Sequence, residues 1–242
     1  MKFLVVVLAL VAAVFADDDY DIKRLALQNP DLYDGDMAGI NGPFDAERNA
    51  IPGDNYRWPG AQVPYVIDSS LGGGVPSYIQ QAFQNYHTYT CVRFVPKTNQ
   101  RDYINIFHGQ GCYSHVGRTG GQQPVSLGSG CAFVGTAIHE LGHALGFYHE
   151  QNRSDRDDYL TIYLQNIQQG MEFNFSKLSP SQNILYTTFD YGSIMIYGND
   201  AFSKDGRSPT MVAKNGQRLL NPFDKQTMTQ SDVTRVKKMY NC

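Results

Sequence analysis

The 242-residue sequence contains no excess of basic residues, no internal repeat and no low-complexity tract. Its 20 Lys and Arg residues are balanced by 23 Asp and Glu residues, so it lacks the basic stripe that is typical of a dedicated nucleic-acid-binding protein. After the first 16 residues, no apolar run approaches the ~20 residues that a transmembrane helix needs. A composition of 42% hydrophobic and 18% charged residues excludes a disordered, collagen-like or coiled-coil chain and favours a globular fold.

The first 16 residues have the features of a secretory signal peptide. Lys2 supplies a positive charge, residues 3–14 form an apolar run of 12, and Ala16 closes a small-residue cleavage site with Val14 two positions earlier. Twelve apolar residues are too few to span a bilayer. The sequence therefore predicts a protein that is secreted to the extracellular space and has no membrane partner.

Residues 17–48 form an acidic leader that differs from the rest of the chain. Residues 1–48 hold nine acidic and four basic residues, a net charge of −5, whereas residues 49–242 hold 14 acidic and 16 basic residues, a net charge of +2. The leader is weakly apolar and could not form a hydrophobic core by itself. We expect the folded domain to lie in residues 49–242.

The cysteines predict two disulfide bonds. All four, Cys91, Cys112, Cys131 and Cys242, lie after the leader, and an even number in an oxidising compartment is typical of paired cysteines. Four cysteines allow three pairings, and their spacing does not choose among them.

Hydrophobic periodicity outlines the secondary structure of the domain. β-branched and aromatic runs predict strands at residues 62–67, 91–95 and 103–107. Apolar side chains at helical spacing predict helices at residues 76–90, 132–146 and 231–240. Residues 109–130 are rich in glycine and are predicted to form a loop, and regular signals weaken after Gln151.

The strongest functional signal is a cluster of three histidines within 11 residues, out of six histidines in the whole chain. His139 and His143 are four residues apart, so on a helix both imidazoles can reach one metal ion. Glu140 can approach that ion as a general base without being a ligand. Gly146 can end the helix in a left-handed conformation and let the chain return His149 as a third ligand. H-E-x-x-H alone arises by chance, but the full pattern leaves a fourth position for water, as in catalytic Zn²⁺ sites.

The pattern H-E-x-x-H-x-x-G-x-x-H followed by a methionine turn is the metzincin signature, and Met195 lies in such a turn at residues 191–197. Because Glu150 directly follows the third histidine, the chain resembles the astacin family of zinc endopeptidases. The resemblance covers nearly the whole chain, and its other matching positions are residues 50–54, Trp58, residues 91–94, 111–114, 125–127 and 130–131, and Cys242.

The resemblance implies an α+β fold of the metzincin type. In the family, a mixed five-stranded sheet and helices form the N-terminal half, the C-terminal half is mostly irregular, and substrate lies in an active-site cleft between them. The resemblance also implies the disulfide bonds Cys91–Cys242 and Cys112–Cys131.

The resemblance further implies the catalytic roles. One Zn²⁺ is held by the three histidines, and Glu140 is the general base. Tyr197 contacts the metal in the resting enzyme and then helps to stabilise the oxyanion. Ile196 stands where the family usually has histidine, and because that histidine is not a zinc ligand, we still expect activity.

The leader resembles an activation pro-segment at residues 17–48. Asp36 is expected to bind zinc in place of the catalytic water, and Asp34 is an alternative ligand two residues earlier. A trypsin-like protease is expected to cut the Arg48–Asn49 bond. Glu150 is then expected to contact the new N-terminus.

Protein or peptide substrates are expected to pair with an edge strand formed by Val125, Ser126 and Leu127. N-glycosylation sequons begin at Asn152 and Asn174, and Asn174 is the better candidate because a glycan at Asn152 would crowd the zinc motif.

No further module follows Cys242, so we expect a stand-alone, monomeric protease. One alternative is a catalytically weak secreted binding protein or toxin-like effector on the same scaffold. Another is a disulfide-linked structural domain with an incidental metal ion. The intact Glu140 argues against the first alternative, and the second leaves Glu140, Asp36 and Tyr197 unexplained.

Overall fold

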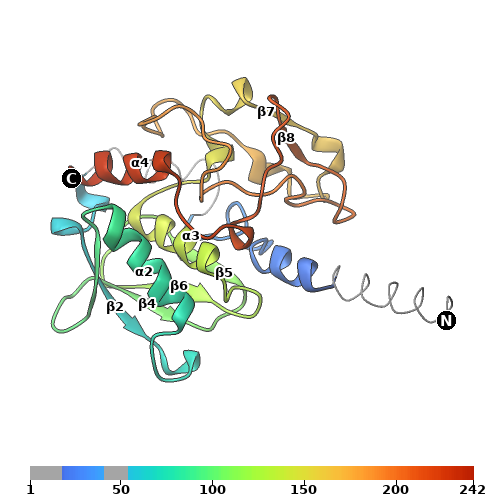
Figure 1. Ribbon diagram of the computed structural model, residues 1–242. Helices are drawn as coiled ribbons and strands as arrows, with labels where there is room; N and C mark the ends of the chain where they lie inside the picture. The colour runs from blue at the N-terminus through green and yellow to red at the C-terminus, as the bar shows by residue number, and fades with distance from the viewer. Residues whose placement is uncertain (1–17, 41–53) are drawn as a thin grey trace, which may run out of the picture.

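The computed structural model describes residues 18–40 and 54–242. Two predicted features, the signal peptide at residues 1–16 and the Arg48–Asn49 cleavage site, lie outside the described residues. Within the described ranges, no helix is long and apolar enough to cross a membrane. The expected α+β fold is confirmed, with sheet and helices in one half and a largely irregular second half (Figure 1).

The main sheet has six strands in the order β1-β5-β6-β4-β2-β3. Their bounds are Met37–Ala38 (β1), Gln62–Ile67 (β2), Arg93–Pro96 (β3), Tyr103–Phe107 (β4), Cys112–His115 (β5) and Gln122–Leu127 (β6). β5 runs antiparallel to β6, and the other neighbouring pairs are parallel. Five strands belong to the predicted domain, as expected, whereas β1 comes from the acidic leader. We call residues 18–40 the N-terminal segment.

Two predictions for residues 109–130 are wrong. The expected loop contains β5 and β6, because the glycines of this stretch lie before, between and after the two strands and obscure their short runs in the sequence. The residues expected to form the edge strand of the sheet lie instead in β6, an interior strand between β5 and β4. All three are buried: Val125, Ser126 and Leu127. The chain turns back after β5, so β5 is the edge of the domain on this side, and β1 covers it.

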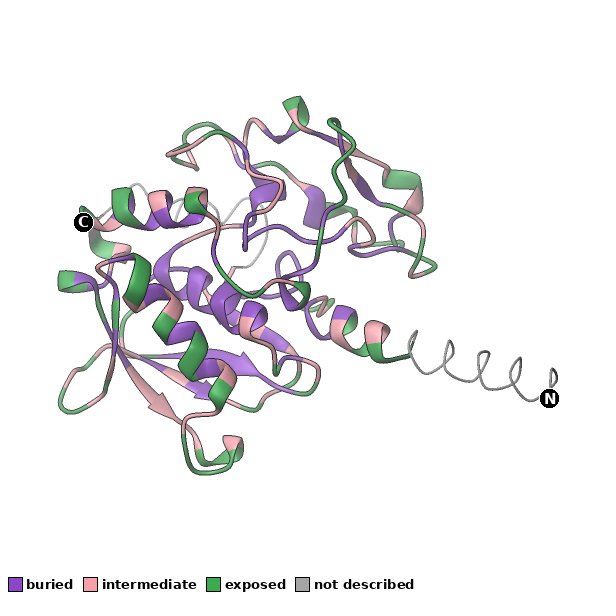
Figure 2. Cartoon of the chain, in the orientation of Figure 1, coloured by how far each residue is buried: buried purple, intermediate pink, exposed green. Residues whose placement is uncertain are grey.

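Two helices pack together beside the sheet. α2 (Ser77–Tyr89) buries one face of side chains spaced three and four residues apart. α3 (Val134–Leu145) is buried along almost its whole length (Figure 2). Tyr86 Oη donates a hydrogen bond to the Ile138 carbonyl at 2.8 Å and so joins the two helices. α3 therefore offers a site that is shielded from bulk water.

Regular structure is sparse after α3, as predicted. A small antiparallel sheet pairs β7 (Leu160–Ile162) with β8 (Met211–Ala213), and short 3-10 turns form much of the remainder. α4 (Gln230–Tyr240) begins with a capping box, in which the Thr229 hydroxyl accepts a hydrogen bond from the Asp232 N–H.

The disulfide bonds implied by the family resemblance are both present in the structure. Cys91–Cys242 joins the chain just after α2 to the chain just after α4. Cys112–Cys131 joins β5 to the segment that precedes α3. On the loop-entropy account, closing a loop with a sequence separation of 151 stabilises the fold by roughly 5 kcal/mol.

The N-terminal segment contacts both halves of the molecule and is the blue helix and strand of Figure 1. Its helix, residues 18–26, lies over the Phe133 ring through Lys23 and also reaches the C-terminal half. There Tyr20 Oη donates to Asp200 Oδ1 at 3.1 Å, and Arg24 Nε lies 3.9 Å from Asp200 Oδ2. Its strand β1 places Met37 opposite Ser114 of β5, in the N-terminal half.

Gly135, near the start of α3, has no room for a side chain. A Cβ atom there would collide with the backbone carbonyl oxygens of Pro222 and Lys225. Alanine is ordinarily the better helix former, yet we expect Gly135→Ala to destabilise the fold by about 3 kcal/mol because backbone would have to move. The Tm should fall by roughly 6–12 °C. Gly74→Ala, in open surroundings, is the control and should shift Tm by about 2 °C or less, and equal Tm values for the two variants would contradict the close packing at Gly135.

Candidate metal centre

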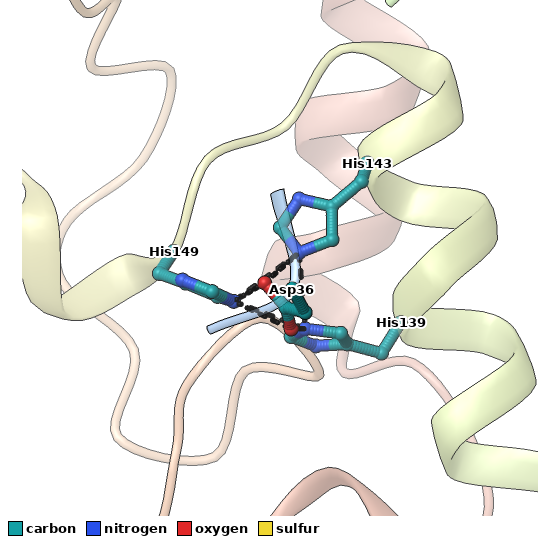
Figure 3. Close-up of side chains that lie close together, drawn as sticks. All are labelled: Asp36, His139, His143 and His149. Atoms are coloured by element: carbon teal, nitrogen blue, oxygen red, sulfur yellow. Dashed lines mark hydrogen bonds and ion pairs between the residues drawn. The ribbon is translucent and has the colours of Figure 1, made fainter. Parts of the chain in front are cut away.

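Three histidine side chains converge at the end of α3. His139 and His143 lie one helical turn apart, and Gly146 ends the helix with a φ of 114°, a left-handed conformation that favours glycine. The chain then turns so that His149 faces the other two histidines (Figure 3). The Nε2 atoms lie 3.1 Å apart for His139–His143 and His139–His149, and 3.2 Å apart for His143–His149. All three side chains are buried.

Each of these histidines uses its other ring nitrogen, Nδ1, as a hydrogen-bond donor. The two histidines on α3 donate to the backbone carbonyls of Ile194 and Phe147, at 2.8 and 2.7 Å. His149 donates to the Asp34 carboxylate at 2.6 Å. A neutral ring that donates from Nδ1 carries its lone pair on Nε2, so three lone pairs point into one small volume once a metal ion replaces any proton held there. This arrangement favours a cation among the three nitrogens.

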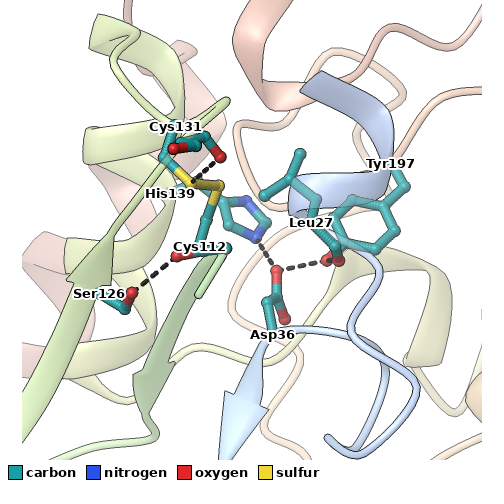
Figure 4. The surroundings of a disulfide bond; sticks show 9 residues. Leu27, Asp36, Cys112, Ser126, Cys131, His139 and Tyr197 are labelled. Atoms are coloured by element: carbon teal, nitrogen blue, oxygen red, sulfur yellow. Dashed lines mark hydrogen bonds and ion pairs between the residues drawn. A yellow bond between two sulfur atoms is a disulfide. The ribbon is translucent and has the colours of Figure 1, made fainter. Parts of the chain in front are cut away.

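Asp36 of the N-terminal segment lies against the same three nitrogens. Its Oδ2 atom is 3.0 Å from His139 Nε2, and its Oδ1 atom is 3.2 Å from His149 Nε2 and 3.4 Å from His143 Nε2. Tyr197 Oη donates a hydrogen bond to the same carboxylate, and Figure 4 shows Asp36 between His139 and Tyr197. Of the two aspartates considered as ligands, Asp36 is the one that faces the histidine cluster.

The four side chains form a donor set that fits zinc. Their ligand atoms all lie within 4.8 Å of one another. Zn–N bonds of about 2.0–2.1 Å in tetrahedral geometry place the nitrogens about 3.3 Å apart, close to the 3.1–3.2 Å observed. Among the residues that the structure describes, the buried Oδ1 atom of Asp36 has no hydrogen-bond partner. A partly unsatisfied buried carboxylate beside three imidazole lone pairs is what a divalent cation requires.

Electrostatics also favour positive charge at this place. Burial lowers the pKa of His139 to about 3, so its imidazole stays neutral. Burial disfavours the ionised form of Asp36, but His149 and His143 outweigh that effect and hold its pKa well below the usual range. Burial would lower the pKa of His149, yet the two nearby aspartates raise it to about 10. The cluster therefore combines an ionised carboxylate with a strong preference for a bound positive charge.

Glu140 follows the first histidine on α3 and is completely buried. Neither of its carboxylate oxygens has a hydrogen-bond partner within the described residues. Burial, reinforced by the negative charge of Asp36, raises the pKa of Glu140 well above its usual value. A carboxyl group in such surroundings can take up and release a proton, as a general base and acid must.

The predicted methionine turn lies beneath the histidines. The Ser193 hydroxyl and the Ile194 N–H donate hydrogen bonds to Asp232 of α4, at 2.6 and 2.8 Å. Met195 is buried against α3, where a Cβ atom at Gly142 would lie only 2.6 Å from its Sδ atom. The turn can therefore pack against α3 because position 142 has no side chain.

The two residues after this methionine have different surroundings. Ile196, in place of the family's usual histidine, is fully buried in the hydrophobic core. Tyr197 points toward the metal cluster, and its hydroxyl oxygen, whose one hydrogen is shared with Asp36, lies 2.9 Å from the Leu27 carbonyl oxygen. Burial, with the charge of Asp36 added, raises the pKa of Tyr197 well above its usual value. The phenol therefore keeps its proton and can act as a hydrogen-bond donor.

Glu150 lies behind the metal cluster in a charge network that was not apparent from the sequence. Arg235 of α4 contacts both carboxylate oxygens at 2.6 Å, and Arg153 contacts one at 3.1 Å. Glu150 also accepts a hydrogen bond from the Asp190 N–H at 2.8 Å. The only sequence signal for Arg235 is its three-residue spacing from Asp232 on α4. Glu150 and both arginines line a pocket whose other walls include Ile184, Leu185, Met195 and Met239.

Both predicted glycosylation sites are buried. Asn152 donates hydrogen bonds to the carbonyls of Asn174 and Ser176, at 3.2 and 3.1 Å. The Asn174 side chain accepts a hydrogen bond from the Asp34 N–H at 2.8 Å. Neither asparagine is exposed, so the preference for Asn174 as a glycan acceptor finds no support in the fold.

Comparisons with known proteins agree with this geometry. The model of the family described as "Astacin (Peptidase family M12A)" matches residues 50–241. "Astacin-like metalloprotease toxin 1" from Loxosceles intermedia is 42% identical over 215 residues, which cover 87% of this chain and 81% of that protein. "Zinc metalloproteinase nas-4" from Caenorhabditis elegans is 43% identical over 198 residues, and the match spans 81% of this chain but only 62% of that longer relative. Among solved structures, high choriolytic enzyme 1, a hatching enzyme zinc-protease from Oryzias latipes, superposes with a TM-score of 0.72 at 39% identity, covering 78% of this chain and 96% of that chain.

Proposed function

Because the chain belongs to the astacin family of zinc metalloproteases, peptidase family M12A, we propose that it is a secreted endopeptidase made in a latent form. Zinc endopeptidase activity on proteins or peptides follows from family membership. The observation that supports latency is the position of Asp36, within 3.0–3.4 Å of the three histidine nitrogens and hydrogen-bonded to Tyr197. The N-terminal segment therefore acts as an inhibitory pro-segment.

The catalytic chemistry is divided among a few side chains. His139, His143 and His149 would hold the zinc ion, which would supply Lewis acidity to the scissile carbonyl and to the attacking water. Glu140 accepts the proton from that water and later delivers a proton to the leaving amine. Tyr197, released from Asp36, donates a hydrogen bond to the developing oxyanion.

The N-terminal segment blocks this chemistry in two ways. Asp36 takes the place of the nucleophilic water, and β1 takes the backbone edge of β5. We therefore assign substrate pairing to β5 (Cys112–His115) instead of residues 125–127. Because edge pairing reads backbone groups more than side chains, a broad range of protein substrates is expected.

Activation is proposed to follow cleavage of the Arg48–Asn49 bond by a trypsin-like protease. Residues 1–16 are then the signal peptide, 17–48 the pro-segment and 49–242 the protease domain, which acts as an extracellular monomer. The new N-terminus is proposed to reach the pocket that Glu150 lines, where Arg235 and Arg153 already pair with the carboxylate and hold it in place.

The test begins with the full chain secreted from eukaryotic cells. The protein is cut with trypsin, its new N-terminus is sequenced, and both forms are assayed on an unfolded protein. We expect an inactive uncut form, an active cut form, loss of activity with a zinc chelator and recovery with added zinc. A folded, zinc-loaded cut form that cleaves no protein would overturn the proposal. That result would favour the alternative, a secreted binding protein or toxin-like effector.

A further inference from the structure

The three histidines differ in the groups that accept a hydrogen bond from their Nδ1 atoms. The two histidines on α3 donate to backbone carbonyls of the protease domain, Ile194 and Phe147, which remain after the N-terminal segment is removed. His149 instead donates to Asp34, a residue of the N-terminal segment, 115 positions away in sequence. One zinc ligand thus depends on the segment for its orientation.

Asp34 is built into this position. It is buried, and its φ of 50° belongs to a tight turn in which the Met37 N–H donates to the Tyr33 carbonyl at 3.1 Å. The Asp34 N–H donates to the buried Asn174 side chain at 2.8 Å. The turn and this hydrogen bond hold the backbone of Asp34 where its carboxylate reaches His149 Nδ1 at 2.6 Å.

A carboxylate on the far nitrogen of a metal-binding histidine orients the ring and increases its basicity. The hydrogen bond here is charge-assisted, and a distance of 2.6 Å is short for an N–H···O contact. Such partners change metal affinity by roughly 10–100-fold when they are removed.

We propose that Asp34 is a positioning residue for His149 and that, through it, the N-terminal segment strengthens zinc binding in the latent form beyond the contribution of Asp36. The inference rests on the proposed function, because it assumes that the segment is removed on activation. The segment then has two acidic contacts with the site: Asp36 on the metal side of the histidines and Asp34 behind one of them. Activation removes both, so the latent form is the form with the higher zinc affinity.

The test compares the uncut full-length protein with its Asp34→Ala and Asp34→Asn variants. Zinc affinity is measured by equilibrium competition with a chromophoric chelator, and the cobalt-substituted proteins are compared by visible absorption. We expect Asp34→Ala to bind zinc roughly 10–100-fold more weakly. Asp34→Asn keeps a hydrogen-bond acceptor and should fall between the two, with a shifted cobalt spectrum. Asp31→Ala, at an exposed position of the same segment, is the matched control and should match the wild type.

Unchanged zinc affinity in a folded Asp34→Ala protein would overturn the inference. So would an uncut Asp34→Ala protein that is already active, because the residue would then hold the segment in place without acting through His149. Cutting at Arg48 removes position 34, so every activated variant has the wild-type sequence. If those activated forms cleave no protein, the proposed function is contradicted. The role of Asp34 is still decided separately, by the zinc affinities of the uncut proteins.

Discussion

Activated protein that carries Glu140→Gln should have a kcat about 10³–10⁴-fold lower than the wild type. Glutamine has nearly the same shape but cannot accept a proton from the nucleophilic water. Because Glu140 is buried and has no hydrogen-bond partner among the described residues, the substitution breaks no contact that the fold needs. Steady-state cleavage of a peptide substrate measures the effect.

Two controls separate loss of chemistry from loss of structure. The zinc content of the Glu140→Gln protein should equal that of the wild type, because Glu140 is not one of the four clustered ligands. Its Tm should be unchanged within about 2 °C. A folded, zinc-loaded variant that retains more than about a tenth of the wild-type kcat would show that another group accepts the proton.

Uncut protein that carries Asp36→Ala should be active without proteolysis. Asp36 supplies the contacts to all three histidine nitrogens and to Tyr197. Losing these buried, charge-assisted contacts costs about 3 kcal/mol. The population of molecules in which the N-terminal segment has left the site therefore rises roughly 100-fold. Hydrolysis of a small peptide by the uncut variant, compared with uncut wild type, measures this increase.

The remaining contacts of the N-terminal segment limit how active the uncut Asp36→Ala protein can become. β1 still pairs with β5, so the uncut variant should remain less active than the cut enzyme. Asp31→Ala is the matched control and should stay latent. If Asp36→Ala is as inactive as the wild type before cutting, steric cover by the segment, and not the carboxylate, maintains latency.

The parts of the site that were predictable from the sequence are those encoded over short distances. The histidine pair and Glu140 follow from one turn of helix, and Gly146 follows from the turn that must come next. Asp36 could be identified as the ligand only through the family resemblance. The structure adds its contacts with three histidines that lie more than 100 positions later.

The parts that were missed depend on long-range pairing. Arg235, which contacts both carboxylate oxygens of Glu150, is 85 residues away, and its spacing from Asp232 does not distinguish a buried arginine on α4 from a solvated one. The position of β6 was missed for a similar reason, because edge and interior strands have the same short apolar pattern, and only the pairing with β5 decides between them. The glycosylation prediction was unsupported for a different reason. A three-residue sequon identifies a possible acceptor asparagine, but it does not show whether that asparagine is buried, as Asn174 is.

The N-terminal segment also has a consequence for molecular motion. Its helix is held to Asp200 in the C-terminal half, and its strand is held to β5 in the N-terminal half, so one short stretch of chain connects both walls of the site. While it is in place, the two halves are restrained from moving apart. On the proposed removal of the segment, we expect hinge-like fluctuations of the two halves on the microsecond-to-millisecond timescale. We expect a substrate that contacts both β5 and the C-terminal half to restore this restraint only while it is bound.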